Sequence, residues 1–352
     1  MELYRDQSFW DAYYEKNRQY VGNNRKLGRW TVLKDRRMYE DNGYAMERLA
    51  SGAYERIWPE MFRKKWGSRV SLSQPAPGEK TVFHSYWCGR IGEKQAFSIK
   101  SCLCTQPPES TEIWLWLDRE NGYEGYEENE YLKPLLPFIR ILSFDADEEI
   151  QGTPYEKAGW MFHGPELTFR ADGFRLLELY KRGGVYFDLD VLFLKSLAPV
   201  LAAGEFCYTW ERQPYANNAL LYLKQGSQLN ERITEKALEL ETFRPWRLLV
   251  YQDRGLSSYI VYPSAFFDPL WQKRKEEPGW LHSFDEFFTS PVLREGEPSF
   301  TLENQRFFPG AYAHHWHNQW KTEPVEGSVY RWFEKQFDKK LELTREARET
   351  DR

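Results

Sequence analysis

The stretch that decides the fold is ADGFRLLELYKRGGVYFDLDVLFLKSL, residues 171–197. Apolar side chains recur on one stripe from about residue 165 to 182, which predicts an amphipathic helix that ends at the double glycine. A short apolar strand, Val185–Phe187, follows and delivers Asp188 and Asp190 at its carboxyl end. Because side chains alternate along a strand, both carboxylates are expected on one side of the chain.

Two carboxylates in this position form a hard oxygen site suited to Mg²⁺ or Mn²⁺, and such an ion neutralises a diphosphate leaving group. The same D-x-D pattern occurs at Asp145 and Asp147. We interpret that copy as a solvated turn, because it lacks the context of the first. The first copy follows a fully apolar strand, and Asp172 and Arg175 stand three residues apart on the preceding helix.

Strands and helices alternate on both sides of this segment. The sequence predicts strands at residues 81–87, 112–117, 138–144 and 185–187, and a helix at residues 91–104. Strands separated by helices of this length predict an α/β fold with a mostly parallel central sheet. Ligands of such sheets bind beyond the carboxyl ends of the strands, which is where the two carboxylates are expected.

The composition restricts the function classes. The chain has 352 residues, 41% of them hydrophobic, and a formal net charge of −5, which argues against a dedicated nucleic-acid binder. No apolar stretch approaches the ~18 residues that a membrane-spanning helix needs, and the N-terminus lacks the pattern of a signal peptide. The 15 Trp, 22 Tyr and 23 Phe are of the type that often line sugar or base sites, although most must pack the core.

Residues 1–76 differ from the rest and are expected to form a helical N-terminal extension, followed by a domain over residues 77–325 and a charged helix over residues 326–352. The first 75 residues hold 15 basic and 10 acidic side chains, with six of the basic ones between residues 25 and 37. That run is either a solvated helical face or a docking surface for an anionic acceptor or for membrane headgroups, which would give peripheral membrane contact.

Three motifs point to one family. The run over residues 172–191, DGFR…YKRGGVYFDLDV, resembles the D-x-x-R…Y-x-x-G-G-x-Y-x-D-x-D signature of glycosyltransferases whose sugar-binding region contains a D-x-D motif. Members include yeast-type α-1,6-mannosyltransferases, lactosylceramide-type α-1,4-galactosyltransferases and bacterial capsule enzymes, with the clostridial glucosylating toxins as remoter relatives. HSYW at residues 84–87 is similar to the family's opening strand, and HHWHNQW at residues 314–320 is similar to its H-x-W-x-x-S-W ending.

The resemblance implies a GT-A, Rossmann-like glycosyltransferase fold, a nucleotide-sugar donor, a divalent ion (Mn²⁺ or Mg²⁺) and retention of anomeric configuration. The residues that it marks as catalytic are Asp172, Arg175, Asp188 and Asp190. The residues that it marks as metal ligands are Asp188, Asp190 and His314. The residues that it marks as donor-binding are His84, Trp87, Asp172, Arg175, Tyr186, Asp188, Asn217, Asn218 and Trp320.

Within that set, Trp87 would stack on the base and Trp320 would close over the diphosphate. The choice of His314 rests on the alignment alone, so His315 and His317 stay open as the histidine that meets the ion. One departure concerns the leaving phosphate: the family's Ser before the last Trp is Gln319 here. A Gln amide can still donate a hydrogen bond in its place.

The implied function is transfer of a hexose from a nucleotide-sugar, with a UDP-sugar favoured over a GDP-sugar, to a hydroxyl of a glycan or glycoconjugate. The membrane anchor of Golgi members is not visible, so we expect a cytoplasmic protein of a bacterium or of a virus in its host cell. The main alternative is a non-catalytic nucleotide-sugar or carbohydrate-binding module that kept the fold. A haloacid-dehalogenase-type phosphohydrolase is disfavoured, because Val191 and Leu192 replace the Gly-Thr that would follow its D-x-D.

Overall fold

The computed structural model describes residues 80–202, 204–210, 215–249, 260–262, 264–272, 281, 283–291, 302, 307–308 and 311–350. The expected N-terminal extension, with its basic run at residues 25–37, lies outside these residues.

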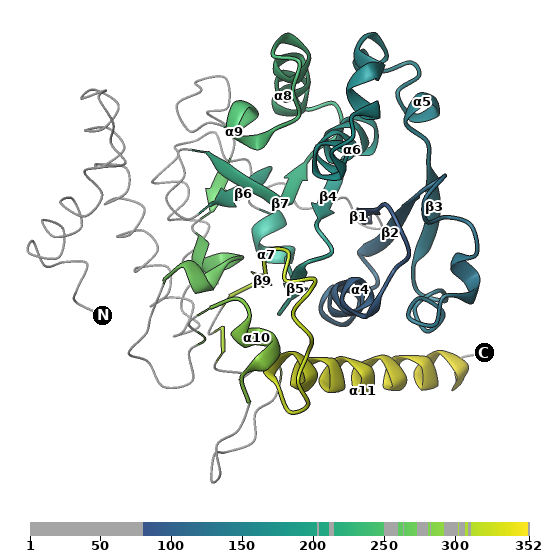
Figure 1. Ribbon diagram of the computed structural model, residues 1–352, viewed down its shortest axis with the longest axis vertical. Coiled ribbons are helices and arrows are strands. Elements are labelled where there is room, and N and C mark those ends of the chain that lie inside the picture. The colour runs from purple at the N-terminus through teal and green to yellow at the C-terminus, as the bar shows by residue number, and fades with distance from the viewer. Residues whose placement is uncertain are drawn as a thin grey trace, which may run out of the picture.

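A seven-stranded sheet forms the centre of the described structure (Figure 1). Its strands, in spatial order, are β3 (Arg140–Phe144), β2 (Thr111–Asp118), β1 (Thr81–Trp87), β4 (Gly184–Phe187), β7 (Ala216–Leu223), β6 (Phe206–Thr209) and β8 (Ile260–Tyr262). Within this sheet β7 pairs antiparallel with both of its neighbours, and the other pairings are parallel. The predicted α/β class, with the mostly parallel central sheet of the GT-A type, is confirmed.

Helices cover both faces of the sheet (Figure 1). The long ones are α4 (Glu93–Thr105), α6 (Leu167–Arg182), α8 (Gln228–Glu239) and α11 (Val329–Thr350). Two hydrophobic clusters result, one beneath α4 and α11 and the other beneath α6 and α8. Side chains of β1 point alternately to the two faces of the sheet and so contribute to both clusters: Phe83 belongs to the first cluster and Tyr86 to the second.

The double glycine after α6 has a steric role. Gly183 and Gly184 have φ of 66° and 103°, values that residues with a Cβ rarely adopt. A Cβ on Gly184 would also lie 2.3 Å from the carbonyl oxygen of Val82. Glycine at this position therefore lets the chain turn out of α6 and enter β4 directly beside β1.

A second, two-stranded sheet joins distant parts of the chain. Its strands are β5 (Val191–Phe193), which follows the D-x-D, and β9 (Ala313–His315), which pairs with it antiparallel. This pairing carries the histidine-rich C-terminal motif to the carboxyl end of β4. The remaining elements are η3 (Tyr126–Glu128), α5 (Ala146–Glu149), η4 (Pro154–His163), α7 (Ala198–Leu201), α9 (Pro245–Leu248), η6 (Ser264–Phe266), η7 (Pro269–Gln272) and α10 (Glu286–Thr289).

Candidate functional site

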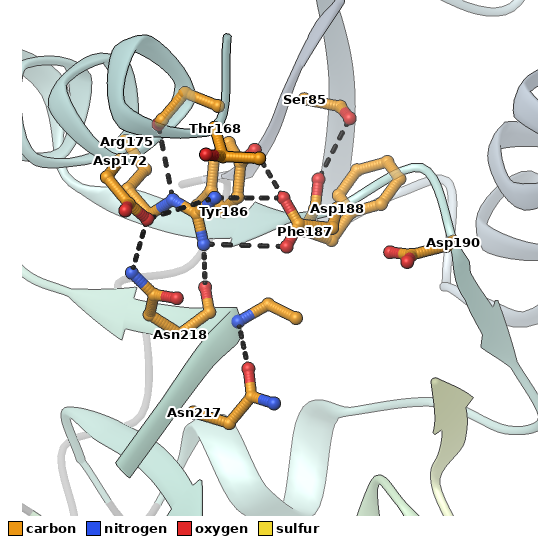
Figure 2. Close-up of polar contacts among 12 residues, drawn as sticks. Ser85, Thr168, Asp172, Arg175, Tyr186, Phe187, Asp188, Asp190, Asn217 and Asn218 are labelled. Carbon is orange, nitrogen blue, oxygen red and sulfur yellow. Dashed lines mark hydrogen bonds and ion pairs between the residues drawn. The ribbon is translucent and has the colours of Figure 1, made fainter. Parts of the chain in front are cut away.

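The two acids of the D-x-D motif lie in the turn between β4 and β5. β4 ends at Phe187, one residue before Asp188, so strand alternation does not set the directions of the two carboxylates. The turn instead gives the two acids different partners. Figure 2 shows Asp188 within a polar cluster on α6, β4 and β7, whereas Asp190 stands apart from that cluster.

Arg175 and Tyr186 hold Asp188 (Figure 2). An Nη2 of Arg175 lies 3.1 Å from Oδ1 of Asp188, and the Tyr186 hydroxyl donates to the same oxygen at 2.7 Å. The guanidinium also covers the Tyr186 ring, 4.4 Å from its centroid, and donates to the carbonyl oxygen of Asn218 at 2.7 Å. Tyr186 is 1% exposed, so the structure places it as a support for Asp188 in the interior.

Asp172 lies beside this cluster and joins it to β7. Asn218 donates from its amide nitrogen to Oδ1 of Asp172 at 3.1 Å, and Arg175 lies 3.5 Å from the same oxygen. Burial raises the pKa of Asp172 to about 6, against the opposing effect of Arg175. Arg244, which the sequence did not single out, donates to Oδ2 of Asp172 at 3.3 Å. Local motifs give no signal for Arg244, because it lies 72 residues away along the chain.

The Asn217 side chain forms a hydrogen bond with the backbone of its own strand, β7. Its side-chain oxygen accepts from the backbone amide of Ala219 at 2.8 Å, and its side chain is 3% exposed. Of the two asparagines expected near the donor sugar, the structure thus brings Asn218 to Asp172 and Arg175. Asn217 supports the start of β7.

Asp190 contacts the C-terminal motif. Its Oδ2 accepts from the backbone amide of Asn318 at 2.8 Å and lies 3.2 Å from Nε2 of His315. Burial alone would raise the pKa of Asp190, but His315 and the Asn318 amide lower it to about 2. Burial likewise opposes protonation of His315, yet the nearby carboxylates raise its pKa to about 9. An ionised Asp190 beside a protonated His315 is the arrangement that these shifts favour.

The structure does not bring His314 to the two acids; the histidine that lies at Asp190 is His315. Adjacent residues of β9 point to opposite sides, and His314 stacks on Phe308 with ring centroids 4.2 Å apart. Neither of its ring nitrogens has a hydrogen-bond partner among the residues that the structure describes. Burial holds the pKa of His314 well below its usual range, which keeps the ring neutral.

A further acid and histidine lie next to His315. Nε2 of His317 is 2.6 Å from Oδ2 of Asp268, and the rings of His315 and His317 stack with centroids 3.8 Å apart. Asp268 follows η6 and is fully buried. Asp268 is not predictable from the sequence, because no motif surrounds it and only the tertiary fold places it beside the C-terminal histidines.

The two tryptophans expected at the nucleotide meet each other. Trp87 ends β1, and its ring contacts that of Trp320 edge to face, with centroids 5.2 Å apart. Both are partly exposed. Lys94 of α4 donates to the backbone carbonyls of Gln319 and Thr322 and so fixes the loop that carries Trp320.

His84 lies in the interior of the sheet. One of its ring nitrogens is 3.0 Å from the carbonyl oxygen of Gly183, and the other accepts from the Trp116 indole at 3.2 Å. Burial lowers the pKa of His84 to about 4. A direct contact to the donor would have to displace one of these protein partners.

The second D-x-D copy lies at the surface. Asp145 caps α5 by accepting from the amide of Glu148, and Arg119 pairs with both of these acids. Asp147 pairs with His163 at 2.9 Å, and the side chains of both are more than half exposed. These contacts fit the interpretation of this copy as a solvated turn.

Residues 95–207 match the family described as glycosyltransferase sugar-binding region containing DXD motif. The matched segment runs from α4 to β6 and contains Asp172, Arg175, Asp188 and Asp190. Residues 95–207 of this chain are thus similar to the sugar-binding region of the DXD glycosyltransferases. The family predicted from the three sequence motifs is thereby confirmed over the segment that holds both acids and Arg175.

Several solved glycosyltransferase structures are similar to this chain at low identity. The galactosyltransferase LgtC, in complex with donor and acceptor sugar analogues, is 13% identical over 73% of this chain and 95% of its own, with a TM-score of 0.41. GlyE of Streptococcus pneumoniae TIGR4 is 12% identical over 75% and 63% of the two chains, with a TM-score of 0.43. The PaToxG glycosyltransferase is 16% identical over 58% and 72%, with a TM-score of 0.35. No curated protein matches the sequence with significance.

Among the residues that the structure describes, no helix combines the length and the apolar character that a membrane crossing requires.

Proposed function

We propose that this protein is a metal-dependent, retaining hexosyltransferase. It moves a hexose from a nucleotide-sugar, with a UDP-sugar favoured over a GDP-sugar, to a hydroxyl of a glycan or glycoconjugate. The observation that carries the proposal is the pairing of Asp188 with Arg175 and of Asp190 with His315, just beyond the carboxyl end of β4. Ligands of parallel α/β sheets bind at that edge.

The donor set fits a divalent ion. Asp188 and Asp190 offer carboxylate oxygens and His315 offers an imidazole nitrogen, a combination that suits Mn²⁺ better than Mg²⁺. The orphaned, buried Oδ1 of Asp268 supports the fit, because it lies in the same group of acids and histidines without a partner among the described residues. When bound, the ion would supply positive charge to the departing diphosphate.

The remaining side chains orient the donor. Asp172 and the Asn218 amide form one fixed pair with Arg175, and such a rigid set can accept and donate hydrogen bonds to sugar hydroxyls. The Trp87 and Trp320 rings, which contact each other at the end of β1, would hold the base and cover the diphosphate. Stacking of a base on an aromatic ring contributes about 1–3 kcal/mol in nucleic-acid complexes.

For the stereochemistry we favour front-side transfer. A retaining glycosidase places a second carboxylate as nucleophile about 5 Å from the acid. Here Asp172, Asp188 and Asp190 all have cationic partners in the protein. In front-side transfer the acceptor oxygen bonds to the anomeric carbon while the bond to the phosphate oxygen breaks, and the acceptor proton passes to that phosphate oxygen. Mass spectrometry that detects a covalent glycosyl-enzyme would overturn this mechanism.

A donor panel tests the proposal. UDP- and GDP-sugars are incubated with the full chain and Mn²⁺, and release of nucleoside diphosphate is measured. We expect release from one donor, and a loss of about a hundredfold or more in Asp190→Ala, since the charge stabilisation in question amounts to several kcal/mol. Asp147→Ala, the same change in the surface copy, is the control and should stay near wild type.

The same panel separates the main alternative. A non-catalytic binding module would bind a nucleotide-sugar without releasing the diphosphate. Absence of release with every donor, or equal loss in Asp147→Ala and Asp190→Ala, contradicts the assigned site.

A further inference from the structure

We propose that Asp268, His315 and His317 form a transition-metal site beside Asp190. The three residues each offer one ligand atom, and these atoms all lie within 4.8 Å of one another. Asp190 and one histidine of the C-terminal motif already belong to the site discussed above. The new element is Asp268, which no motif of the chain marks, together with the use of His315 and His317 in one site. The inference deepens the proposed function and rests on it for the role of the ion, but not for binding of the ion.

The first support is the arrangement of the two histidines. Their rings stack with centroids 3.8 Å apart and planes 30° apart, so both imidazoles lie side by side. Nε2 of one faces a carboxylate oxygen of Asp190, and Nε2 of the other faces one of Asp268. The ligand atoms of Asp268, His315 and His317 therefore lie close together, and Asp190, in the D-x-D turn, contacts His315.

The second support is an unused ligand atom. Asp268 is fully buried, and its Oδ2 accepts from the Trp271 indole at 2.7 Å as well as from His317. Its Oδ1 is buried and has no partner among the residues that the structure describes. A buried carboxylate oxygen without a partner is costly, and a cation would satisfy it.

The third support is that neighbouring side chains orient the ligands. The Tyr208 hydroxyl lies 3.0 Å from Nδ1 of His315, which leaves Nε2 for the carboxylate side. Metal-binding histidines commonly have such a partner on their second nitrogen. Phe284 and Trp271 pack edge-on against His317, with centroids 4.6 and 5.3 Å away, and so restrict the orientation of its ring.

The backbone adds a fourth observation. His317 and Asn318 have φ of 49° and 57°, a left-handed conformation that is uncommon outside glycine. This turn aims the His317 ring at Asp268 and the Asn318 amide at Asp190. Conformations of this kind concentrate at functional sites, where the surrounding structure maintains them.

The ligand types indicate the class of ion. Imidazole nitrogens favour first-row transition ions, whereas Mg²⁺ and Ca²⁺ take oxygen ligands and Mg²⁺ gives up its water reluctantly. Two histidines with carboxylates therefore select Mn²⁺, Co²⁺ or Zn²⁺ over Mg²⁺. A site of this composition would give the enzyme its preference among ions.

The test measures binding of Mn²⁺ alone to the full chain, with no donor. Free Mn²⁺ is followed by electron paramagnetic resonance, and pulsed measurements detect coupling of bound Mn²⁺ to imidazole nitrogen. We expect one bound ion that resists excess Mg²⁺, with nitrogen couplings that change when the protein is labelled with ¹⁵N-histidine. Asp268→Asn and His317→Gln should each weaken Mn²⁺ binding at least about tenfold, and His317→Gln should remove one nitrogen coupling.

The surface pair Asp147 and His163 offers matched controls, because it has the same two side chains in contact at 2.9 Å but largely exposed. Asp147→Asn and His163→Gln should bind Mn²⁺ as wild type does. Bound Mn²⁺ without nitrogen coupling in the wild-type protein overturns the proposal, and this measurement does not depend on any variant folding. Unchanged Mn²⁺ affinity in folded Asp268→Asn and His317→Gln also overturns it.

The outcome is separable from that of the proposed function. Mn²⁺ binding that depends on Asp268 and His317, without release of diphosphate from any donor, leaves the metal site standing while the transferase proposal fails. If a donor releases diphosphate but Mn²⁺ binding does not depend on Asp268 and His317, the transferase proposal stands and the proposed metal site fails.

Discussion

Arg175 is the residue on which most of the candidate site depends. Its guanidinium is 4% exposed and reaches the Asp188 carboxylate, the Asn218 carbonyl and the Tyr186 ring. A buried charge is tolerated when it is paired and hydrogen-bonded, and here the planar fork makes several of these contacts at once. The positions of Asp188 and of the start of β7 are therefore coupled through one side chain.

Arg175→Lys tests this coupling. A lysine keeps the charge but has no planar fork, so it cannot bind Asp188 and the Asn218 carbonyl with the same geometry. We expect donor turnover to fall about 10- to 100-fold, in the range seen when residues that orient metal ligands are changed. Arg119→Lys alters the surface cluster around Asp145 and should leave turnover unchanged; an equal loss there would contradict the role of Arg175.

Among the elements, the turn from α6 into β4 and the pairing of β5 with β9 position the site. The first needs glycine at residues 183 and 184, because the chain turns with positive φ and passes close to β1. The second places the C-terminal motif against the D-x-D, with Val191 opposite His315. Register matters here, because a shift by one residue would bring His314 rather than His315 to the side of Asp190.

Gly184→Ala should destabilise the fold through the first of these elements. The new Cβ would meet the Val82 carbonyl oxygen at 2.3 Å, and that oxygen belongs to the backbone of β1. Gly226→Ala is the matched control, because Gly226 also has positive φ, 65°, but open space around it. We expect a loss of about 1 kcal/mol in the control and about 1–3 kcal/mol more in Gly184→Ala. Urea unfolding measures both, and equal losses would show that the close approach is unimportant.

For the molecule as a whole, buried histidines tie stability to pH. His84 has its pKa lowered to about 4 by burial, whereas in the unfolded chain it returns to the ordinary 6.5. Between these values the unfolded state binds the extra proton, so stability falls as the pH falls. His315 acts in the opposite direction, because its folded pKa is raised to about 9 and its stabilising contribution is lost as the pH rises above 6.5.

The contribution of His84 to the free energy of unfolding should thus decline on the acid side of pH 6.5, against the opposite contributions of Asp172 and Glu178, whose pKa values burial raises to about 6 and about 8. His84 alone contributes a slope of about 1.4 kcal/mol per pH unit down to about pH 4. His84→Gln should lower stability at pH 7, because two buried partners lose their histidine, and should remove the His84 contribution from the slope between pH 6.5 and 4. His163→Gln at the surface should keep the wild-type slope. Urea unfolding at several pH values gives both quantities, and an unchanged slope in His84→Gln would contradict the burial effect.

Local periodicity determined a large part of the fold. β1 spans Thr81–Trp87 as predicted, and α6 ends at Arg182 before the double glycine. Hydrophobic patterns and turn residues act over a few residues, so they can be interpreted without knowing the partner of an element. For the same reason the sequence singled out Asp172 and Arg175, which lie on α6, and Asp188 and Asp190, which lie in the turn after β4.

Tertiary structure decided what lies opposite these residues. The sequence could not choose among His314, His315 and His317, because their order along the chain is independent of which strand face meets Asp190. The pairing of β9 with β5 and the pleat of the strand made that choice. Asp268 and Arg244 enter the site from segments far along the chain, through packing against η6, β9 and α6. Contacts between residues so far apart in the sequence depend on burial and strand pairing across the whole molecule, and a short sequence motif cannot predict them.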